Sequence, residues 1–270
     1  MSQRPPERIV SLCPSITETL FALGAGPRVV GRTRYCIHPA NRVAPIPTVG
    51  GTKTVDLSRV EALRPDLVVA VQEENSESQI RALAQRHEVL LLDPVDIPTA
   101  LQDILRLGAR VGSTASAVGL VHEITAAFEA VPRAADIPVV YLIWRKPLMA
   151  VGAGTYIDAL LVRLGLINQA SGLPSRYPTL DRAAIGRLSP RLVLASTEPF
   201  PFAENHLAEL RATFPGACPV RVDGEMFSWH GARMKLAARY FGELVPRLTA
   251  RGGQLGVPRP APESARNGRA

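Results

Sequence analysis

Cysteines, aromatic residues and long apolar runs are all scarce in this 270-residue chain. The three cysteines, Cys13, Cys36 and Cys218, are dispersed and form no C-x-x-C pair, which excludes a disulfide framework and indicates reduced or buried thiols. No apolar stretch approaches the roughly 20 residues that cross a bilayer, so we expect no membrane-spanning helix.

The common catalytic and metal-binding motifs are missing as well. H-E-x-x-H and G-x-S-x-G do not occur, and GAGTYID at 152–158 matches neither the Walker nor the dinucleotide-binding pattern. Cys36 and His38 lie two residues apart, but a closed metal site needs about four ligands. The other histidines stand alone: His87, His122, His206 and His230. We predict no catalytic residue and no protein-built metal site, and keep Cys36 or His38 as an axial or rim contact to a bound chelate.

Positive charge is in modest excess, with 31 Lys and Arg residues, 24 Asp and Glu residues and a formal net charge of +7. The basic residues are scattered, without a basic helix or an aromatic-interleaved basic stripe, so nucleic acid is not expected as a partner. An anionic small ligand or an acidic partner stays open. Apolar residues make up 46% and charged residues 20%, a composition typical of a globular protein.

Short apolar runs alternate with helical patterns, which predicts an α/β fold with mainly parallel sheets. Ser15 and Glu18 form an S-x-x-E capping box for the first helix, and Thr155 and Asp158 take the same places in the second half. In the N-terminal part we expect strands at 8–12, 28–33, 66–71 and 88–92 and helices at 16–24, 56–64 and 77–86.

Residues 98–131 carry apolar side chains at helical spacing. A continuous helix here would be about 50 Å long, although Gly108, Gly112 and Gly119 weaken it. Two interpretations are open: an amphipathic core helix within a single domain, and a rigid strut between two lobes.

An internal repeat favours the strut. The segments 56–70, DLSRVEALRPDLVVA, and 181–195, DRAAIGRLSPRLVLA, share the pattern D-x6-L-x-P-x-L-V-x-A on either side of the helix. We predict two similar lobes, each a mainly parallel sheet flanked by helices, joined by one long backbone helix. The expected parts are an N-terminal lobe at 1–97, the linking helix at 98–131, a C-terminal lobe at 132–250 and a disordered tail at 251–270.

The start of the chain, MSQRPPERIVSL, passes from a polar segment directly into a predicted strand. It lacks the apolar segment of roughly 7–15 residues and the small-residue cleavage site of an export signal. The sequence as given therefore predicts a cytoplasmic protein, and an omitted upstream signal would make it periplasmic or extracytoplasmic.

Only 5% of the residues are aromatic, yet eight of them lie where predicted strands run into loops. They are Tyr35, Trp144, Tyr156, Tyr177, Phe200, Phe202, Phe227 and Trp229. A flat ligand is held by aromatic faces presented from such loops. We expect several of these rings to line a ligand site and the others to seal the lobes.

Five segments carry a family resemblance: RIVSLCPSITETLFALG, VVGRTRYCIHP, VGGTKTVDLSRVEALRPDLVVA, IWRKPLMAVG and GEMFSWHG. From about residue 8 to residue 248 the chain resembles the bacterial class III substrate-binding proteins, in which a helical backbone joins two lobes. It is most similar to the cobalamin-binding group of ABC importers, and related members take ferric siderophores or haem. The resemblance implies a corrinoid held in a cleft between the lobes, aromatic rings against the macrocycle and little lobe movement.

The resemblance also implies roles for individual residues. Tyr35 matches the family's ligand-stacking tyrosine, and Trp229 matches a tryptophan that reaches the ligand from the second lobe. An aromatic residue often found after the LVVA strand is Val71 here. The predicted ligand site comprises Arg34, Tyr35, Cys36, His38, Trp144, Arg145, Tyr177, Phe227, Trp229 and His230, with Arg32 and Arg176 as further hydrogen-bond donors. Glu77 and Glu204 fit the exposed glutamates that dock onto a permease.

The expected function is binding of a cobalamin-like corrinoid, by the substrate-binding component of an ABC importer or a soluble relative of one. The protein would act as a monomer, with a metal chelate as ligand rather than as catalytic cofactor, and with an ABC permease as partner if exported. Two alternatives stay open: a ferric-siderophore or haem receptor of the same fold, and a cytosolic corrinoid-handling protein or enzyme.

Overall fold

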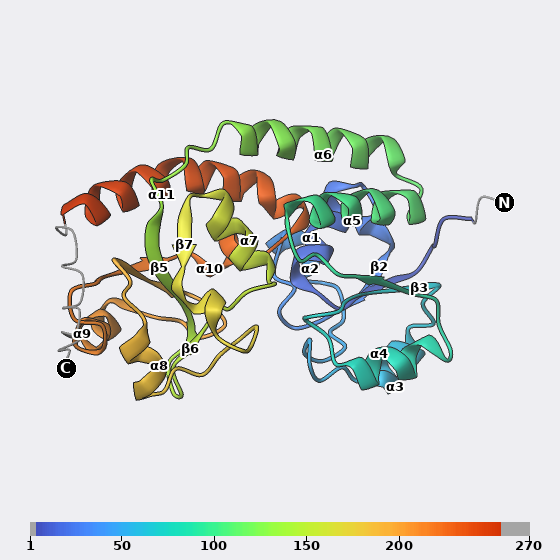
Figure 1. Cartoon of the computed structure of the whole chain (residues 1–270). Helices are drawn as coiled ribbons and strands as arrows, with labels where there is room; N and C mark the ends of the chain where they lie inside the picture. The colour runs from blue at the N-terminus through green and yellow to red at the C-terminus, as the bar shows by residue number, and fades with distance from the viewer. Residues whose placement is uncertain (1–3, 255–270) are drawn as a thin grey trace, which may run out of the picture.

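The computed structural model describes residues 4–254, which form two α/β lobes side by side (Figure 1). The N-terminal lobe contains a four-stranded parallel sheet in the order β2-β1-β3-β4. Its strands are β1 (Ile9–Ser11), β2 (Val29–Arg32), β3 (Leu67–Val71) and β4 (Val89–Leu92). Its helices are α1 (Pro14–Ala22), the 3-10 turn η1 (Gly26–Arg28), α2 (Ala40–Val43), α3 (Leu57–Ala62) and α4 (Glu77–Ala84).

The C-terminal lobe repeats this plan with one addition. Strands β7-β5-β8-β9 are parallel neighbours, and the short β6 pairs antiparallel with the end of β5. The strands are β5 (Ile137–Trp144), β6 (Met149–Ala150), β7 (Leu166–Asn168), β8 (Leu192–Ser196) and β9 (Cys218–Val222). The helices are α7 (Tyr156–Arg163), η2 (Gln169–Gly172), α8 (Arg182–Arg187), α9 (Glu204–Thr213), α10 (Gly224–Ser228), η3 (Gly231–Arg233) and α11 (Met234–Gln254).

The internal repeat occupies equivalent places in the two sheets. Asp56 caps α3 by accepting a hydrogen bond from the Arg59 amide, and Asp181 caps α8 in the same way through the Ala184 amide. The strands that follow, β3 and β8, are central and fully buried. The prediction of two similar, mainly parallel lobes is therefore confirmed.

The prediction of one continuous helix over residues 98–131 is wrong. The segment forms two helices, α5 (Ile97–Arg110) and α6 (Thr114–Glu129), and α6 folds back along α5 before crossing to the second lobe (Figure 1). The chain turns at Gly112, whose φ of 72° is readily adopted only by glycine. Gly108 permits the close packing, because a Cβ atom there would lie 2.2 Å from the Ala117 Cβ atom. The link between the lobes is therefore α6 alone.

One buried apolar cluster is shared by both lobes. It joins Ile9, Leu67 and Val69 of the first sheet to Val139 and Leu194 of the second, through side chains of α5, α6 and α11. Alternate residues along the strands face two separate outer clusters, one in each lobe. A shared core beside α6 favours a fixed arrangement of the lobes.

Helix α11 extends further than the sequence predicted. Residues 251–254, assigned to a disordered tail, form its last turn. The rest of that predicted tail, 255–270, lies outside the described residues. Within residues 4–254 no helix is both long enough and apolar enough to cross a membrane.

Candidate functional site

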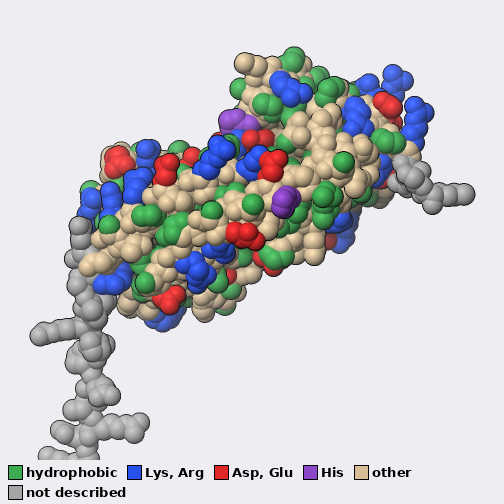
Figure 2. Space-filling view, turned by 90° about the horizontal axis from the view of Figure 1, so that it is seen from above, with side chains coloured by type: hydrophobic (Ala, Val, Ile, Leu, Met, Phe, Trp, Pro, Cys, Tyr) green, Lys and Arg blue, Asp and Glu red, His purple; other side chains and the backbone are tan. Residues whose placement is uncertain are grey.

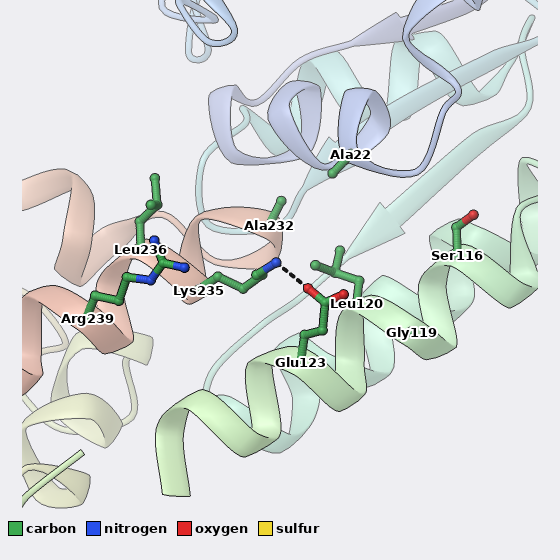
Figure 3. A pocket seen from close by; sticks show the side chains of 9 residues that line it. All are labelled: Ala22, Ser116, Gly119, Leu120, Glu123, Ala232, Lys235, Leu236 and Arg239. Carbon is green, nitrogen blue, oxygen red and sulfur yellow. Dashed lines mark hydrogen bonds and ion pairs between the residues drawn. The ribbon is translucent and has the colours of Figure 1, made fainter. Parts of the chain in front are cut away.

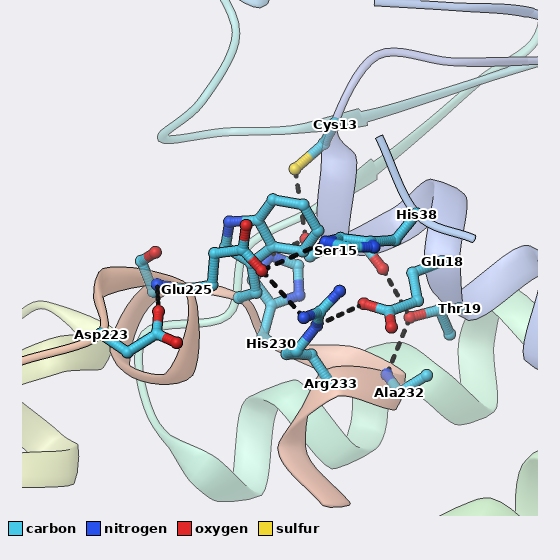
Figure 4. A network of polar contacts seen from close by, with 12 residues as sticks. Cys13, Ser15, Glu18, Thr19, His38, Asp223, Glu225, His230, Ala232 and Arg233 are labelled. Carbon is cyan, nitrogen blue, oxygen red and sulfur yellow. Dashed lines mark hydrogen bonds and ion pairs between the residues drawn. The ribbon is translucent and has the colours of Figure 1, made fainter. Parts of the chain in front are cut away.

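Ser15 and Glu18 do not cap α1, contrary to the prediction. The helix begins at Pro14 with Cys13 at the N-cap and no side-chain cap, because proline is pre-set for a first helical position. The two side chains turn instead to the C-terminal lobe (Figure 4). Ser15 Oγ lies 3.2 Å from His230 Nε2, and Glu18 accepts a hydrogen bond of 2.8 Å from Arg233 Nε. The corresponding prediction for α7 is confirmed for Thr155, whose Oγ1 accepts a hydrogen bond from the Asp158 amide, whereas the Asp158 carboxylate accepts from Asn168 Nδ2 and does not complete a capping box.

Five side chains from both lobes form what we call the inter-lobe cluster: Glu18, His38, Glu225, Trp229 and Arg233 (Figure 4). The Arg233 guanidinium is buried and pairs with Glu18 and with Glu225, each at 2.8 Å. His38 Nε2 lies 3.3 Å from Glu225 Oε2. The cluster therefore connects α1 and the loop after β2 to the segment that leads into α11.

Trp229 is held from several sides. Its Nε1 donates a 2.9 Å hydrogen bond to Glu198 Oε1, and the Arg233 guanidinium lies 4.8 Å from the ring centroid. His38 meets the indole in an edge contact, with the ring centroids 5.5 Å apart. Only 7% of the residue is exposed. A ligand that stacks on this indole must displace a neighbouring side chain or widen the gap between the lobes.

The loop after β2 presents Tyr35 to solvent. The residue is 53% exposed, and the Arg34 guanidinium lies 5.6 Å from the centroid of its ring. The adjacent Cys36 is fully buried, with its Sγ atom 3.1 Å from Thr33 Oγ1, and burial raises the pKa of the thiol. The loop therefore exposes an aromatic face and keeps the thiol away from solvent.

A second contact between the lobes joins Tyr177 and Arg176 to Glu73, which follows β3. The Tyr177 hydroxyl donates a hydrogen bond to Glu73, and Arg176 Nη2 lies 3.4 Å from Glu73 Oε2. Burial, followed by the Glu73 carboxylate, raises the pKa of Tyr177. This predicted aromatic residue is thus fixed by a carboxylate of the opposite lobe.

Trp144 ends β5, Arg145 follows it, and both side chains contact residues of the C-terminal lobe. Trp144 is exposed and packs edge-on against Phe200, with the centroids 5.8 Å apart. Arg145 forms a 2.6 Å ion pair with Glu209 of α9. Arg32, on the other lobe, donates to the carbonyl oxygens of Val43 and Thr33. These guanidinium groups are engaged within their own lobes.

Phe227 and His230 are buried rather than presented to a ligand. Phe227 is fully buried and packs against Tyr141, Tyr240 and Phe241. Burial lowers the pKa of His230 to about 4, so the imidazole beside Ser15 is neutral at physiological pH. We therefore assign both residues, and Cys36, to the support of the site.

The sequence analysis missed the charged side chains that hold the site together, among them Glu73, Glu198, Glu225 and Arg233. A signal for two of them was present. Glu73 and Glu198 each stand three residues after the alanine that ends one copy of the repeat, Ala70 and Ala195. Because β3 and β8 are equivalent, this spacing places both carboxylates at the same end of the two sheets.

Glu77 and Glu204 are exposed residues at the first positions of α4 and α9. Glu77 pairs with Arg81 at 2.5 Å, and Glu204 lies 3.5 Å from Arg221. Both helices lie on the side of the molecule away from α6 (Figure 1). The positions agree with helix N-termini that favour acidic residues, and nothing within the described residues contacts them from another lobe.

A cavity elsewhere in the molecule and the surface seen from above contain no group of residues like the inter-lobe cluster among the described residues. A cavity of about 600 Å³ lies between α6 and the start of α11, where Lys235 pairs with Glu123 (Figure 3), and it contains none of the predicted ligand residues. On the face seen in Figure 2, Lys and Arg side chains are spread among acidic and apolar ones. Among residues 4–254, no three His, Cys, Asp or Glu side chains are grouped so as to hold a metal ion.

Comparison with known proteins agrees with this architecture. A "Vitamin B12-binding protein" of Pectobacterium carotovorum is 24% identical over 255 residues, which cover 91% of this chain and 89% of that protein. The solved structure of the periplasmic vitamin B12-binding protein BtuF of Vibrio cholerae superposes with a TM-score of 0.72 at 17% identity, covering 90% of this chain and 98% of that one. The periplasmic haem-binding protein HutB of the same organism gives 0.73 at 20% identity, covering 88% and 98%.

At these identities the solved structures establish a common fold and do not distinguish a corrinoid from haem. The relatives are named as binding proteins, and those in solved structures as periplasmic. The family model described as "Periplasmic binding protein" matches residues 9–213, from β1 to the end of α9. The chain therefore belongs to the periplasmic binding protein family.

Proposed function

We propose that the protein binds a flat metal chelate, cobalamin or a related corrinoid, between Tyr35 of the N-terminal lobe and Trp229 of the C-terminal lobe. The observation that carries the proposal is the meeting of the Tyr35 loop with the Trp229 segment, through the contact of His38 with Trp229 and Glu225. Tyr35 is exposed, and Trp229 becomes accessible once a neighbouring side chain such as His38 is displaced. Rings on facing segments suit a macrocycle, because each stacking contact contributes on the order of 1 kcal/mol beyond buried area.

The chelate would be cargo for an ABC permease. Glu77 and Glu204, one exposed at a helix start in each lobe, are the proposed contacts with arginines of that permease. Relatives with solved structures are named as periplasmic, which supports an extracytoplasmic site of action. A single chain carries both exposed glutamates, Glu77 and Glu204, so we expect it to act as a monomer. Haem is the second candidate ligand, because a haem-binding neighbour matches the fold as well as a B12-binding one does.

Tryptophan fluorescence tests the ligand site directly, because the chain has two tryptophans. In a Trp144→Phe background, all tryptophan emission comes from Trp229. We expect cyanocobalamin to quench this emission saturably, and Tyr35→Ala to weaken the apparent affinity by about tenfold or more, since one stacking face is lost. Tyr35→Phe, which keeps the ring, is the matched control and retains affinity.

Circular dichroism of each variant checks that the fold is intact. Unchanged affinity of the Tyr35→Ala variant would remove Tyr35 from the site. A parallel titration with haemin, followed through its Soret absorbance, decides between the two ligands: the tighter of the two saturable titrations identifies the preferred macrocycle.

A further inference from the structure

We infer that the carboxylates of Glu73, Glu74 and Glu198 make the inter-lobe site selective for a macrocycle with amides, rather than carboxylates, around its rim. This inference rests on the proposed function and narrows its ligand class. Corrinoids such as cobinamide carry peripheral amides, whereas haem and cobyrinic acid carry peripheral carboxylates.

The carboxylates approach the site from both lobes. Glu73 and Glu74 follow β3, and Glu198 follows β8. Glu74 and Glu198 lie near enough for the negative charge of Glu74 to act on Glu198 across the lobes. Burial raises the pKa of both side chains, which means that their negative charges are poorly solvated where they stand.

Two of these carboxylates accept hydrogen bonds from the aromatic side chains that would hold the ligand. Glu73 accepts from the Tyr177 hydroxyl, and Glu198 accepts from Trp229 Nε1 at 2.9 Å. The O–H and N–H bonds lie in or near the ring planes, so the acceptor oxygens sit at the ring edges. The rim of a macrocycle stacked on either ring therefore passes close to a carboxylate.

Three of the neighbouring arginines already form ion pairs with carboxylates of the protein. Arg233 pairs with Glu18 and Glu225, Arg145 pairs with Glu209, and Arg176 pairs with Glu73. Within residues 4–254, no ion pair is formed by Glu74 or Glu198. Lys53 Nζ donates to the Glu73 carbonyl oxygen at 2.5 Å, and its charge acts on Glu74. Arg34, whose side chain reaches the Thr54 hydroxyl at 3.5 Å, is placed to meet one anionic group at the rim.

The chemistry follows from these charges. A ligand carboxylate brought beside Glu74 and Glu198 adds like charge in a poorly solvated place, and the nearby charge of Lys53 offsets this only in part. A ligand amide donates hydrogen bonds to the same oxygens and carries no charge. One phosphate, as in cobalamin, is compatible with Arg34.

The test compares two corrinoids that share the ring and differ at the rim. Dicyanocobinamide carries amides and dicyanocobyrinic acid carries carboxylates, and each is titrated by quenching of Trp229 in the Trp144→Phe protein at pH 8. We expect the amide form to bind at least about tenfold more tightly, because like-charge contacts discriminate strongly. In a Glu74→Gln, Glu198→Gln double variant the ratio should shrink by a similar factor, mainly through tighter binding of the acid.

Glu243→Gln is the control, since Glu243 is an exposed residue of α11, and it should leave the ratio unchanged. Equal binding of the two corrinoids, or a preference for the acid, would overturn the selectivity while leaving the proposed function in place. An unchanged ratio in the folded double variant would overturn the assignment to these glutamates. Absence of binding by both corrinoids would overturn the proposed function itself.

Discussion

His230 shows how a single buried side chain contributes to the contact between the lobes. It is 5% exposed, lies 3.2 Å from the Ser15 hydroxyl and meets Tyr156 edge-on, with ring centroids 6.2 Å apart. Burial disfavours the protonated imidazole and lowers the pKa to about 4. The folded protein therefore resists protonation of a group that the unfolded chain protonates near pH 6.5.

The protein should lose stability in acid through this residue. Because the unfolded chain binds the proton first, the contribution is complete above about pH 6.5 and is lost as the pH falls towards 4. Between pH 7 and pH 4.5, the free energy of unfolding should fall by about 2 kcal/mol more in the unmodified protein than in His230→Gln. Urea unfolding at the two pH values measures this difference, and parallel decreases in both proteins would contradict the account.

At this scale the sequence patterns drew attention to aromatic residues rather than to charged ones. Tyr35, Trp144 and Tyr177 were predicted as ligand residues because rings at strand ends are unusual in a chain with few of them, and their role in binding stays a prediction. Glu18 and Arg233 form their ion pair across 215 positions of sequence, and no local pattern predicts a contact of that kind. Phe227 lies in the same kind of segment as Trp229, and only the packing of α10 against α11 shows that it is core.

Among the elements, the 3-10 turn η3 packs closely against α1 of the opposite lobe. Gly231 lies at its start with φ 81°, and a Cβ atom there would lie 2.1 Å from Thr19 Oγ1 of α1. The Thr19 hydroxyl also accepts a 3.0 Å hydrogen bond from the Ala232 amide. The turn and α1 can therefore pack at this distance only with glycine at position 231.

Gly231→Ala should lower the free energy of unfolding by at least about 2 kcal/mol, since it combines backbone strain with a clash. Gly242→Ala is the matched control: this glycine is inside α11 with open space around it, and alanine there should raise stability by about 1 kcal/mol or less. Chemical denaturation of both variants checks the prediction. Similar small changes in the two would show that η3 does not pack as described.

The elements themselves were largely predictable, and the exceptions have physical reasons. The strands of the N-terminal lobe follow from apolar runs bounded by turns, and the repeat identified β8 as the equivalent of β3. The break between α5 and α6 was missed because a helical period is insensitive to one glycine in a left-handed conformation. The antiparallel β6 is two residues long, too short for a pattern of its own.

At the scale of the whole molecule, the lobes are joined by α6, by a shared core and by buried charge. Arg233 is the central residue of the buried charges: 6% of its side chain is exposed, and it lies 2.8 Å from the carboxylates of Glu18 in one lobe and Glu225 in the other. Lys235, two residues further on, forms an ion pair with Glu123 of α6 and has 40% of its side chain exposed. Both basic residues therefore form ion pairs between different elements of the fold, but the Arg233 side chain is buried and the Lys235 side chain is exposed to water.

Arg233→Ala should lower the free energy of unfolding by about 3 kcal/mol, because it removes the buried guanidinium that the partly buried carboxylates of Glu18 and Glu225 share. Lys235→Ala should change it by less than about 1 kcal/mol, because an exposed ion pair is screened by water. Urea denaturation at pH 7 compares the two variants. Equal effects would mean that the inter-lobe cluster does not hold the lobes together.

Isothermal titration of the purified protein with cyanocobalamin tests the central claim most directly, namely that a corrinoid binds between the lobes. The account predicts saturable binding of one ligand per chain with a dissociation constant below about 1 µM, weakened in Tyr35→Ala. Absence of heat at a ligand concentration of about 100 µM, with the protein shown to be folded, would contradict it.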